Sequence, residues 1–470
     1  MERRRCITTT TQPNRPPRFE RTGWWWGALG FLVLSTVHVV WAFYAIMHME
    51  LDNLNSITPD FAWYYFAFRD IWFHHGHGLY NAVYQTRWLH AHHIGRAYGR
   101  RIYAYPPLFA LLFAPVGLLS FSSAFWAWNL LSAVSFGALV YLAGTLSSTR
   151  SVVRLALWGV ALWFFAAYYN FLAGQVDIMI AFLVALSLCF IYDRNRPRLG
   201  GGLAALAASL KVTPAIFLVL WVFQRRWRVV VGGLVIAVGG VLFALPFMPF
   251  SNFTTYLFHT LGELSKLNTS YGGAPFNDSI KGIVLSTRFR AAAGIIGMIV
   301  GILALGIFTG YLEWYHAEDF LDRRLTMAFV SYLVVLASPL IEPHTWILVL
   351  FPMALTTGYW MDQISSERPL WLVVLLVAWT LFILANTGDV VPAINGPPLV
   401  DQTVLRGGIV SVKHYGLLFL PTYLAHVLTA LQRLGGETLA FVALLWGMKR
   451  NHQSASKARI TRKDQQPLSN

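Results

Sequence analysis

Charged residues are scarce in this sequence. Asp, Glu, Lys and Arg make up 12 % of its 470 residues, whereas hydrophobic residues make up 56 % and aromatic residues 15 %. So few charged side chains cannot cover the surface of soluble domains of this length, because charged residues collect where a protein faces water. The shortage excludes an ordinary soluble enzyme and indicates a membrane protein.

Cysteine is nearly absent as well. Cys6 lies in a basic N-terminal stretch and Cys189 in an apolar segment, so neither a disulfide nor a thiolate metal site is expected. No cleavable signal is expected either. The first apolar run is as long as a full membrane span, and it lacks a small-residue cleavage pattern.

Strict alternation of polar and apolar residues, which marks the strands of a transmembrane barrel, is also missing. Several apolar runs instead approach or reach the roughly 20 residues that a helix needs to cross a bilayer. Examples are residues 229–250 and 372–385. We therefore expect an all-α polytopic membrane protein with about 10–13 transmembrane or re-entrant helices and two longer extracytoplasmic loops.

Much of the formal net charge of +15 lies near the two ends of the chain. The positive-inside bias predicts two basic cytoplasmic tails, 1–23 and 449–470, around a single membrane domain, 24–448. The outer loops are then about 48–104 and 250–288. No basic patch interleaves with a soluble fold, so nucleic acid is not an expected partner. The lipid bilayer is an expected partner, and a bacterial inner membrane is the expected location.

Residues 199–223 form an unusual apolar segment, because RNRPR before it and QRRWR after it are both basic. A single crossing would place one basic flank outside, against the positive-inside bias. A pair of short helices that enters, turns at Lys-Val-Thr-Pro and returns keeps both flanks inside. The short, proline-containing stretch 105–120 is expected to be a membrane-dipping or interfacial helix.

This topology gathers unusual polar residues on the outer side of the membrane. An intramembrane or membrane-boundary ionisable group is a candidate functional residue, because its burial in lipid is costly. The sequence therefore predicts an extracytoplasmic site at the membrane boundary, with candidates Asp60, Arg69, Gln175, Asp177, Lys211, Asn277, Ser279, Lys281, Glu342 and His344.

Five motifs in order resemble glycosyltransferase family 87, of the C superfamily of glycosyltransferases. They are YPPLFALLFAPVGLL, AGQVDIMIAFLVAL, GGLAALAASLKVTPAIFLVLWVFQRRWR, NDSIKGIVL and SPLIEPH. The resemblance runs from about residue 56 to 361. It implies transfer of a sugar, mannose or another hexose, from a polyprenyl-phosphate-sugar donor to a lipid or glycan acceptor hydroxyl, with inversion and without a cofactor.

The resemblance also implies a role for Asp60, which matches the general base of the superfamily by its position soon after the first span. An alcohol is a poor nucleophile until a nearby carboxylate accepts its proton. The alternative is an ordinary solvated loop acid.

The leaving polyprenyl phosphate gathers negative charge, so fixed cations near it favour the transition state. Lys211, Arg69, Lys281 and His344 are the candidate phosphate ligands. Lys211 could instead be a snorkelling or loop lysine, and Arg69 could be paired with an acid or face lipid headgroups. His344 matches a family histidine, but the SPxSWxHH form reads SPLIEPHT here and loses the tryptophan and the second histidine.

Four further polar residues are candidates for binding the sugar or the acceptor: Gln175, Asp177, Asn277 and Glu342. For the first two, helix capping or a hydrogen bond between helices is an alternative role. The histidines of HHGHG (74–78) and HAHH (90–93) could bind zinc, but no accompanying acid or cysteine set is present. We expect no metal there and read these stretches as interfacial segments.

Two other functions remain open on the sequence. A transporter or flippase of a lipid-linked saccharide also needs intramembrane polar residues, but it should place them on discontinuous helices near the midplane in both halves. A scaffold or assembly factor would need no chemistry. A large loop with an acid after the first span favours an enzyme.

Overall fold

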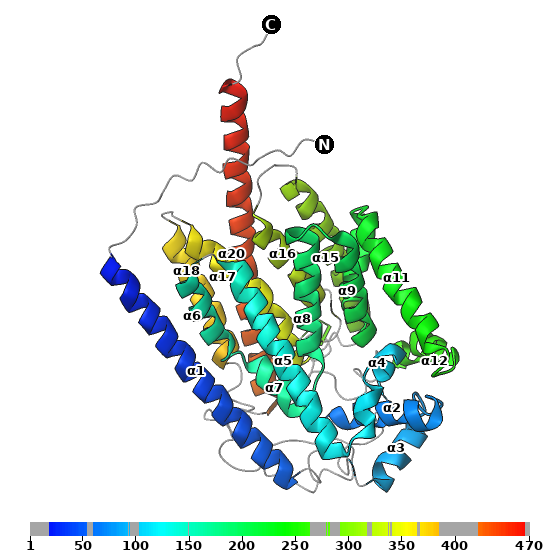
Figure 1. Cartoon of the computed structure of the whole chain (residues 1–470). Helices are drawn as coiled ribbons and strands as arrows, with labels where there is room; N and C mark the ends of the chain where they lie inside the picture. Colours follow the sequence, from blue (N-terminus) through cyan, green and yellow to red (C-terminus); the bar gives the residue numbers. More distant parts are fainter. Residues whose placement is uncertain are drawn as a thin grey trace.

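The computed structural model describes residues 18–53, 60–92, 94, 103–148, 150–263, 279, 281–282, 292–316, 322–336, 338, 341–363, 367–384 and 422–465. All regular elements within these ranges are helices (Figure 1), which confirms the predicted all-α class. Within the same ranges, three helices are long and apolar enough to cross a membrane: α5 (Phe121–Ser147), α11 (Trp227–Ala244) and α15 (Ala293–His316).

Several predicted spans are divided in the structure. α6 (Ser151–Ala161) and α7 (Phe165–Ala173) together are long and apolar enough for one span, but they meet at 47°. α8 (Asp177–Leu188) continues into a π-helical turn, η2 (Cys189–Asp193). The other helices of the bundle are α16 (Arg323–Leu336), η5 (Pro343–Val349), α17 (Leu350–Asp362), α18 (Arg368–Leu384) and α20 (Thr422–Gln465), the last of which extends into the predicted C-terminal tail.

The segment 199–223 enters and returns as predicted. α9 (Pro197–Leu210) ends at Lys211, whose backbone is extended, and α10 (Ala215–Phe223) begins after Pro214. Proline disfavours a helical conformation at the preceding residue, which explains the break. α9 and α11 begin side by side, because a Cβ on Gly201 would lie 1.9 Å from the carbonyl oxygen of Val229. The basic flanks of the segment therefore share one end of the molecule.

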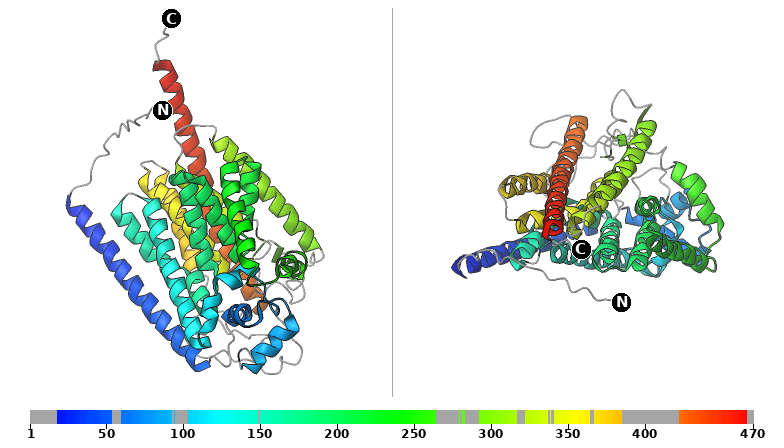
Figure 2. Two further views of the ribbon diagram at one scale, coloured as in Figure 1. Left: turned by 45° about the vertical axis from the view of Figure 1, so that its right-hand side comes forward. Right: turned by 90° about the horizontal axis from the view of Figure 1, so that it is seen from above.

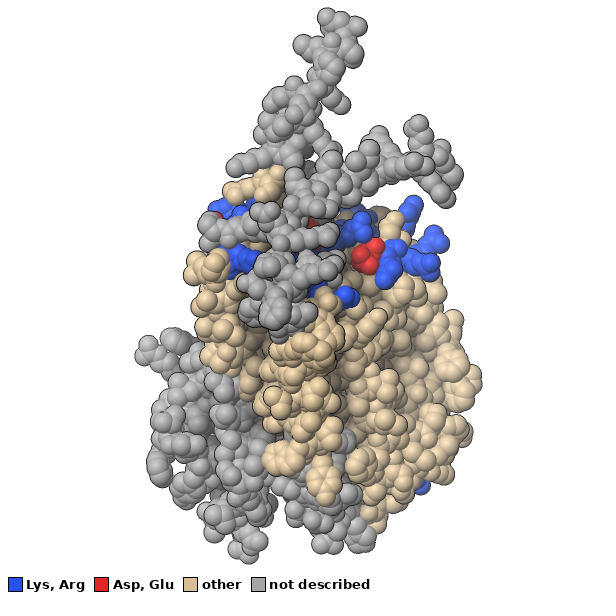
Figure 3. Space-filling view, turned by 60° about the vertical axis from the view of Figure 1, so that its left-hand side comes forward, with Lys and Arg blue, Asp and Glu red and all other residues tan. Residues whose placement is uncertain are grey.

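The same end carries most of the visible basic side chains. Lys and Arg form a band around the upper part of the described surface, above a broad uncharged belt (Figure 3). A belt without charged side chains below a basic band is the pattern expected of a protein that spans a bilayer with its basic loops on one side.

The predicted outer loops contain helices at the opposite end. α1 (Arg18–Asn53) is followed by α2 (Phe61–His74) and α3 (Ala82–Ala91), all inside or overlapping the 48–104 segment. Residues 105–120 form two short helices, α4 (Pro107–Leu112) and η1 (Ala114–Leu118), in place of a crossing. The second outer segment starts with α12 (Ser251–Thr255) and η3 (Tyr256–Thr260). Figures 1 and 2 show α2, α3, α4 and α12 grouped together.

Aromatic rings fix α2 against the bundle. Trp128 of α5 is fully buried and lies 5.7 Å from the ring of Phe61 and 5.6 Å from that of Tyr64, centroid to centroid. The Trp128 ring also contacts the rings of Phe109 in α4 and of Phe113, the residue that follows α4. Each such aromatic pair contributes about 0.5–1.5 kcal/mol beyond its buried area. The start of α2 is therefore held rigidly, with Asp60 immediately before it.

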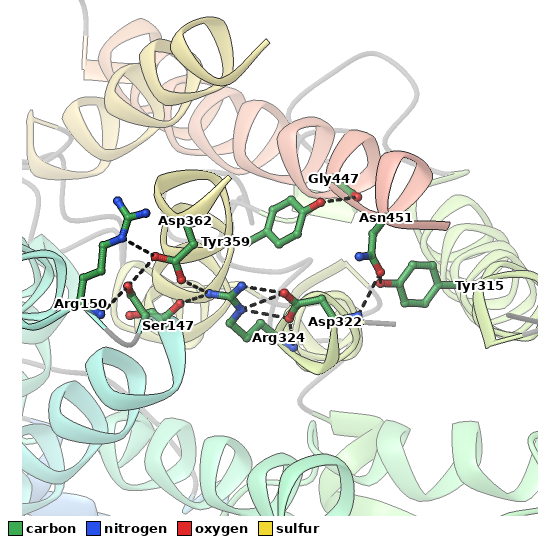
Figure 4. Close-up of polar contacts among 10 residues, drawn as sticks. Ser147, Arg150, Tyr315, Asp322, Arg324, Tyr359, Asp362, Gly447 and Asn451 are labelled. Carbon is green, nitrogen blue, oxygen red and sulfur yellow. Dashed lines mark hydrogen bonds and ion pairs between the residues drawn. The ribbon is translucent and has the colours of Figure 1, made fainter. Parts of the chain in front are cut away.

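A polar network joins the helix ends at the basic end of the molecule (Figure 4). The Arg324 guanidinium donates to Asp322, to Asp362 at 2.6 Å and to the carbonyl oxygen of Ser147 at 2.6 Å. Its side chain is 20 % exposed. Because Arg324 lies on α16 while Ser147 and Asp362 lie on α5 and α17, its single cation ties three helices together.

Replacing Arg324 with Gln is expected to lower the free energy of unfolding in an SDS titration by about 2–4 kcal/mol, since half-buried Asp322 loses its cation and, among described cations, Asp362 keeps only the longer contact of 3.6 Å to Arg150. Arg323→Gln is the matched control, because Arg323 is exposed and donates only to a backbone oxygen at 3.2 Å in the described region. Equal, small effects of the two substitutions would show that the network is not a structural tie.

Candidate active site

Asp60 occupies the N-cap position of α2. Its backbone oxygen accepts from the Trp63 N–H at 3.1 Å, but its side chain makes no capping hydrogen bond. Instead Oδ2 accepts a 2.5 Å hydrogen bond from Nε2 of Gln175, 115 residues further along the chain. The side chain is half-buried. The amide is neutral, so this hydrogen bond does not neutralise the charge of the carboxylate.

Two tyrosines fix the orientation of the Gln175 amide. Oε1 of Gln175 accepts from the Tyr64 hydroxyl at 2.8 Å and from the Tyr105 hydroxyl at 3.1 Å. Burial raises the pKa of Tyr105, and the nearby charge of Asp177 raises that pKa further. Both hydroxyls therefore stay protonated donors, and the Nε2 donor of Gln175 must point the other way, to Asp60.

The turn between α7 and α8 places Gln175 and Asp177 together. Gly174 ends α7 with a φ of +65°, and a Cβ there would lie 2.6 Å from the Cβ of Phe61. Only glycine combines this left-handed backbone with so close an approach to α2. The backbone N–H of Gln175 then closes the turn on the Asn170 carbonyl at 2.8 Å. This turn therefore links the Asp60 contact to the adjacent ionic cluster.

Asp177, Lys211, His344 and Glu342 form that ionic cluster. Nζ of Lys211 lies 2.9 and 3.1 Å from the two carboxylate oxygens of Asp177, which is 1 % exposed. Nε2 of His344 lies 3.4 Å from Asp177 and 3.3 Å from Glu342. Lys211 is 18 % and Glu342 35 % exposed, whereas His344 is buried. Asp177 and His344 thus form the buried side of the cluster. The Lys211 ammonium and the Glu342 carboxylate lie on its partly accessible side.

Lys211 has donor capacity beyond Asp177. An ammonium group has three N–H donors, and the next described partner of Nζ is the hydroxyl of Thr345, at 3.5 Å. The extended backbone at Lys211 ends α9 and lets the side chain reach the turn at Asp177. A cation held in this way can meet an anionic group that enters from the exposed face of the cluster.

Other predicted site residues have different surroundings. Arg69 donates to the Tyr65 hydroxyl at 3.3 Å and to the Gly117 carbonyl at 3.2 Å, and its guanidinium lies 4.6 Å from the centre of the Phe73 ring. These contacts join α2 to η1, and all the described partners of Arg69 are neutral protein groups. Lys281 is buried, close to Gly297 of α15. Ser279 is buried near it, and Asn277 lies outside the described residues.

Sequence reasoning missed Tyr64, Tyr105 and Thr345. Tyr64 and Tyr105 donate hydrogen bonds to the Gln175 amide oxygen, and Thr345 lies beside the Lys211 ammonium. A signal existed for Tyr105, which directly precedes the Pro-Pro of the first quoted motif, and for Thr345, which follows His344. Tyr64 is one of many aromatic residues in its segment and has no such signal.

The described contacts of His74 and His92, in the histidine-rich segments, are with residues outside the ionic cluster. His74 is exposed and 3.6 Å from the buried Asp70, and His92 stacks on Trp88 with centroids 3.9 Å apart. No three His, Cys, Asp or Glu residues in the described parts of the chain are placed to hold a metal ion.

Comparison with known proteins gives one family and several relatives. The family model of glycosyltransferase family 87 matches residues 103–339, a range that contains Gln175, Asp177 and Lys211 but neither Asp60 nor His344. A polyprenol-phosphate-mannose-dependent alpha-(1-2)-phosphatidylinositol pentamannoside mannosyltransferase of Mycolicibacterium smegmatis is 26 % identical over 249 residues, 52 % of this chain and 58 % of that protein. No solved structure matches the chain.

Two proteins of Mycobacterium tuberculosis are similar to the same extent. One, from strain CDC 1551 / Oshkosh, has the same name and is 27 % identical over 275 residues, 57 % of this chain and 60 % of that protein. The other, from strain H37Rv, is a polyprenol-phosphate-mannose-dependent alpha-(1-2)-phosphatidylinositol mannoside mannosyltransferase, 26 % identical over 54 % of this chain and 62 % of its own length. The chain thus spans about three-fifths of the length of these relatives.

Proposed function

The chain belongs to glycosyltransferase family 87, and we propose that it transfers a sugar from a polyprenyl-phosphate-sugar donor to an acceptor hydroxyl at the extracytoplasmic membrane boundary. The protein is an integral membrane protein, and we place both termini and the basic end of the bundle in the cytoplasm. The end that carries Asp60 then faces outward.

One observation carries the proposal: a half-buried carboxylate, Asp60, is joined through Gln175 to the turn that holds Asp177 and Lys211. In the proposed reaction the acceptor oxygen attacks the anomeric carbon of the donor from the side opposite the phosphate. The new carbon–oxygen bond forms while the bond from that carbon to the phosphate oxygen breaks. The hydroxyl proton passes to Asp60, polyprenyl phosphate leaves, and the anomeric configuration inverts.

We assign the second requirement of this reaction, stabilisation of the leaving phosphate, to the ionic cluster. Negative charge grows on the departing phosphate, and the Lys211 ammonium is a fixed cation at the partly accessible face of the cluster. His344 lies between two carboxylates, and we propose that it donates to the same phosphate or to the sugar. Asp177 then acts mainly by holding Lys211 in place and Gln175 by orienting Asp60, while Glu342, 35 % exposed, is the candidate for contact with sugar hydroxyls.

We propose mannose as the first sugar to test, because the relatives are named for polyprenol-phosphate-mannose, and a phosphatidylinositol mannoside as the first acceptor. The altered SPLIEPHT segment makes another hexose the second choice, because this chain lacks the tryptophan and second histidine of the SPxSWxHH form.

The experiment is a donor screen with purified protein in liposomes. Polyprenyl-phosphate mannose, polyprenyl-phosphate glucose, polyprenyl-phosphate arabinofuranose and GDP-mannose are each offered with a phosphatidylinositol mannoside acceptor. The proposal expects product from one of the lipid-linked hexoses and none from the nucleotide sugar. Product from GDP-mannose alone would overturn it.

A further inference from the structure

An open cavity of about 480 Å³ lies among the helices of the predicted outer segments. One wall is the turn before α3 and its first residues, including His77, Tyr80 and Val83, and the other is α12, including Ser251 and Thr255. The volume falls within the range of about 300–1,000 Å³ common to small-molecule sites. His77, Val83 and Ser251 are exposed, so the cavity opens to the surface of the outer segments.

The lining of the cavity is polar but has no fixed charge. Among the described residues that line it, none is Asp, Glu, Lys or Arg, whereas six carry hydrogen-bonding side chains: His77, Tyr80, Asn81, Ser251, Asn252 and Thr255. A phosphate site would be expected to have a lysine or arginine. Hydroxyl and amide groups beside a tyrosine ring instead suit the hydroxyls and the apolar face of an uncharged sugar.

Buried polar groups hold the turn that forms this wall. The carbonyl of Gly76 accepts from the Asn252 side chain at 3.0 Å, and the backbone N–H of Gly78 donates to Asp70 at 2.9 Å. Gly76 has a φ of +72°, and a Cβ there would lie 3.0 Å from the Asn252 amide nitrogen. Because Asn252 and Asp70 are themselves buried, the wall is built rigidly before any ligand arrives.

A chain of hydrogen bonds links the cavity wall to the candidate base. The Tyr80 hydroxyl donates to the Tyr105 carbonyl at 2.7 Å, and the Tyr105 hydroxyl donates to Gln175, which holds Asp60. A ligand that contacts Tyr80 is therefore positioned on the same hydrogen-bonded frame as the carboxylate. This fixed relation is what an acceptor subsite needs, because small displacements of the attacking group lower the rate steeply.

We propose that this cavity binds an uncharged saccharide unit of the acceptor and positions the acceptor hydroxyl toward Asp60. The inference rests on the proposed function for the identity of the reaction, but saccharide binding can be measured without it. It predicts that the acceptor is a glycan or glycolipid with at least one neutral sugar beyond the one that is attacked.

The test fills the cavity with Trp from either wall. Val83→Trp and Ser251→Trp both introduce the ring at an exposed lining position, and His90→Trp adds the same ring to α3 at an exposed residue outside the cavity. We expect both filling variants to raise the KM for a phosphatidylinositol mannoside acceptor by at least about tenfold, with the KM for the donor unchanged. The His90 variant should match the wild type.

A second readout does not depend on catalysis. Saturation-transfer NMR on the protein in micelles should detect binding of methyl α-mannoside to the wild type and its loss in the filling variants. Any binding of inorganic phosphate to the wild type should be unchanged in the filling variants. If the wild type transfers sugar and binds the mannoside while the filling variants do both equally well, the cavity proposal is wrong and the proposed function stands. Absence of mannoside binding to the wild type also overturns it, whereas binding without transfer counts against the proposed function alone.

Discussion

Replacing Asp60 with Asn is expected to reduce sugar transfer by about 10²–10⁴-fold, the usual contribution of a positioned general base. The amide has the same size and its oxygen can still accept the hydrogen bond from Gln175, so the fold should be retained. It cannot take up the proton of the acceptor hydroxyl at neutral pH. The rate is measured with saturating donor and acceptor in liposomes.

A matched control for Asp60 is Asp193→Asn. Asp193 is also a half-buried carboxylate, but it pairs with Arg194 at 3.1 Å, in the segment that joins η2 to α9 at the basic end of the molecule. This variant should keep the wild-type rate. Turnover by the Asp60→Asn protein above about one tenth of the wild-type value would remove Asp60 as the base, since a lost general base costs more than this.

The second large effect concerns Lys211. Lys211→Met alone should abolish most donor use and also destabilise the protein, because Asp177 is 1 % exposed and would keep a buried charge without its cation. Breaking one side of a buried ion pair costs about 3–5 kcal/mol. A loss of activity in this single variant therefore cannot by itself assign Lys211 to the donor phosphate.

The double variant Asp177→Asn, Lys211→Met separates the two roles. It removes both charges, so stability should recover in an SDS titration. If Lys211 binds the donor phosphate, the KM for the donor stays high or kcat stays low in the double variant. Recovery of wild-type donor kinetics together with stability would show that the pair is only structural. Asp177→Asn alone, which leaves the lysine, serves as the control.

Charge placement made some of this architecture predictable from sequence. The return of segment 199–223 followed from its two basic flanks and from Pro214, and α9, α10 and α11 have that arrangement. The same topology placed Asp177, Lys211 and His344 on one side, and the structure brings them into contact. These features depend on local sequence and on the cost of burying charge, which can both be read from one chain.

Long-range packing was not predictable in the same way. The break between α6 and α7 has no proline or glycine to mark it, but Trp163 stacks on His38 of α1 at 3.8 Å and donates to Ser35 at 2.9 Å. Tyr64 and Gln175 meet across 111 residues of sequence. Such contacts override local helix preference and leave no periodic signal, which is why the tyrosine pair around the amide was missed.

The central claim is that the protein transfers sugar and does not simply move a lipid-linked saccharide across the bilayer. The most direct measurement offers radiolabelled polyprenyl-phosphate mannose and a phosphatidylinositol mannoside to proteoliposomes, and follows both the label in product and the donor in each leaflet. The account predicts label in the acceptor with the wild type and only background label with Asp60→Asn. Movement of intact donor between leaflets at equal rates in both proteins, without labelled acceptor, would contradict it.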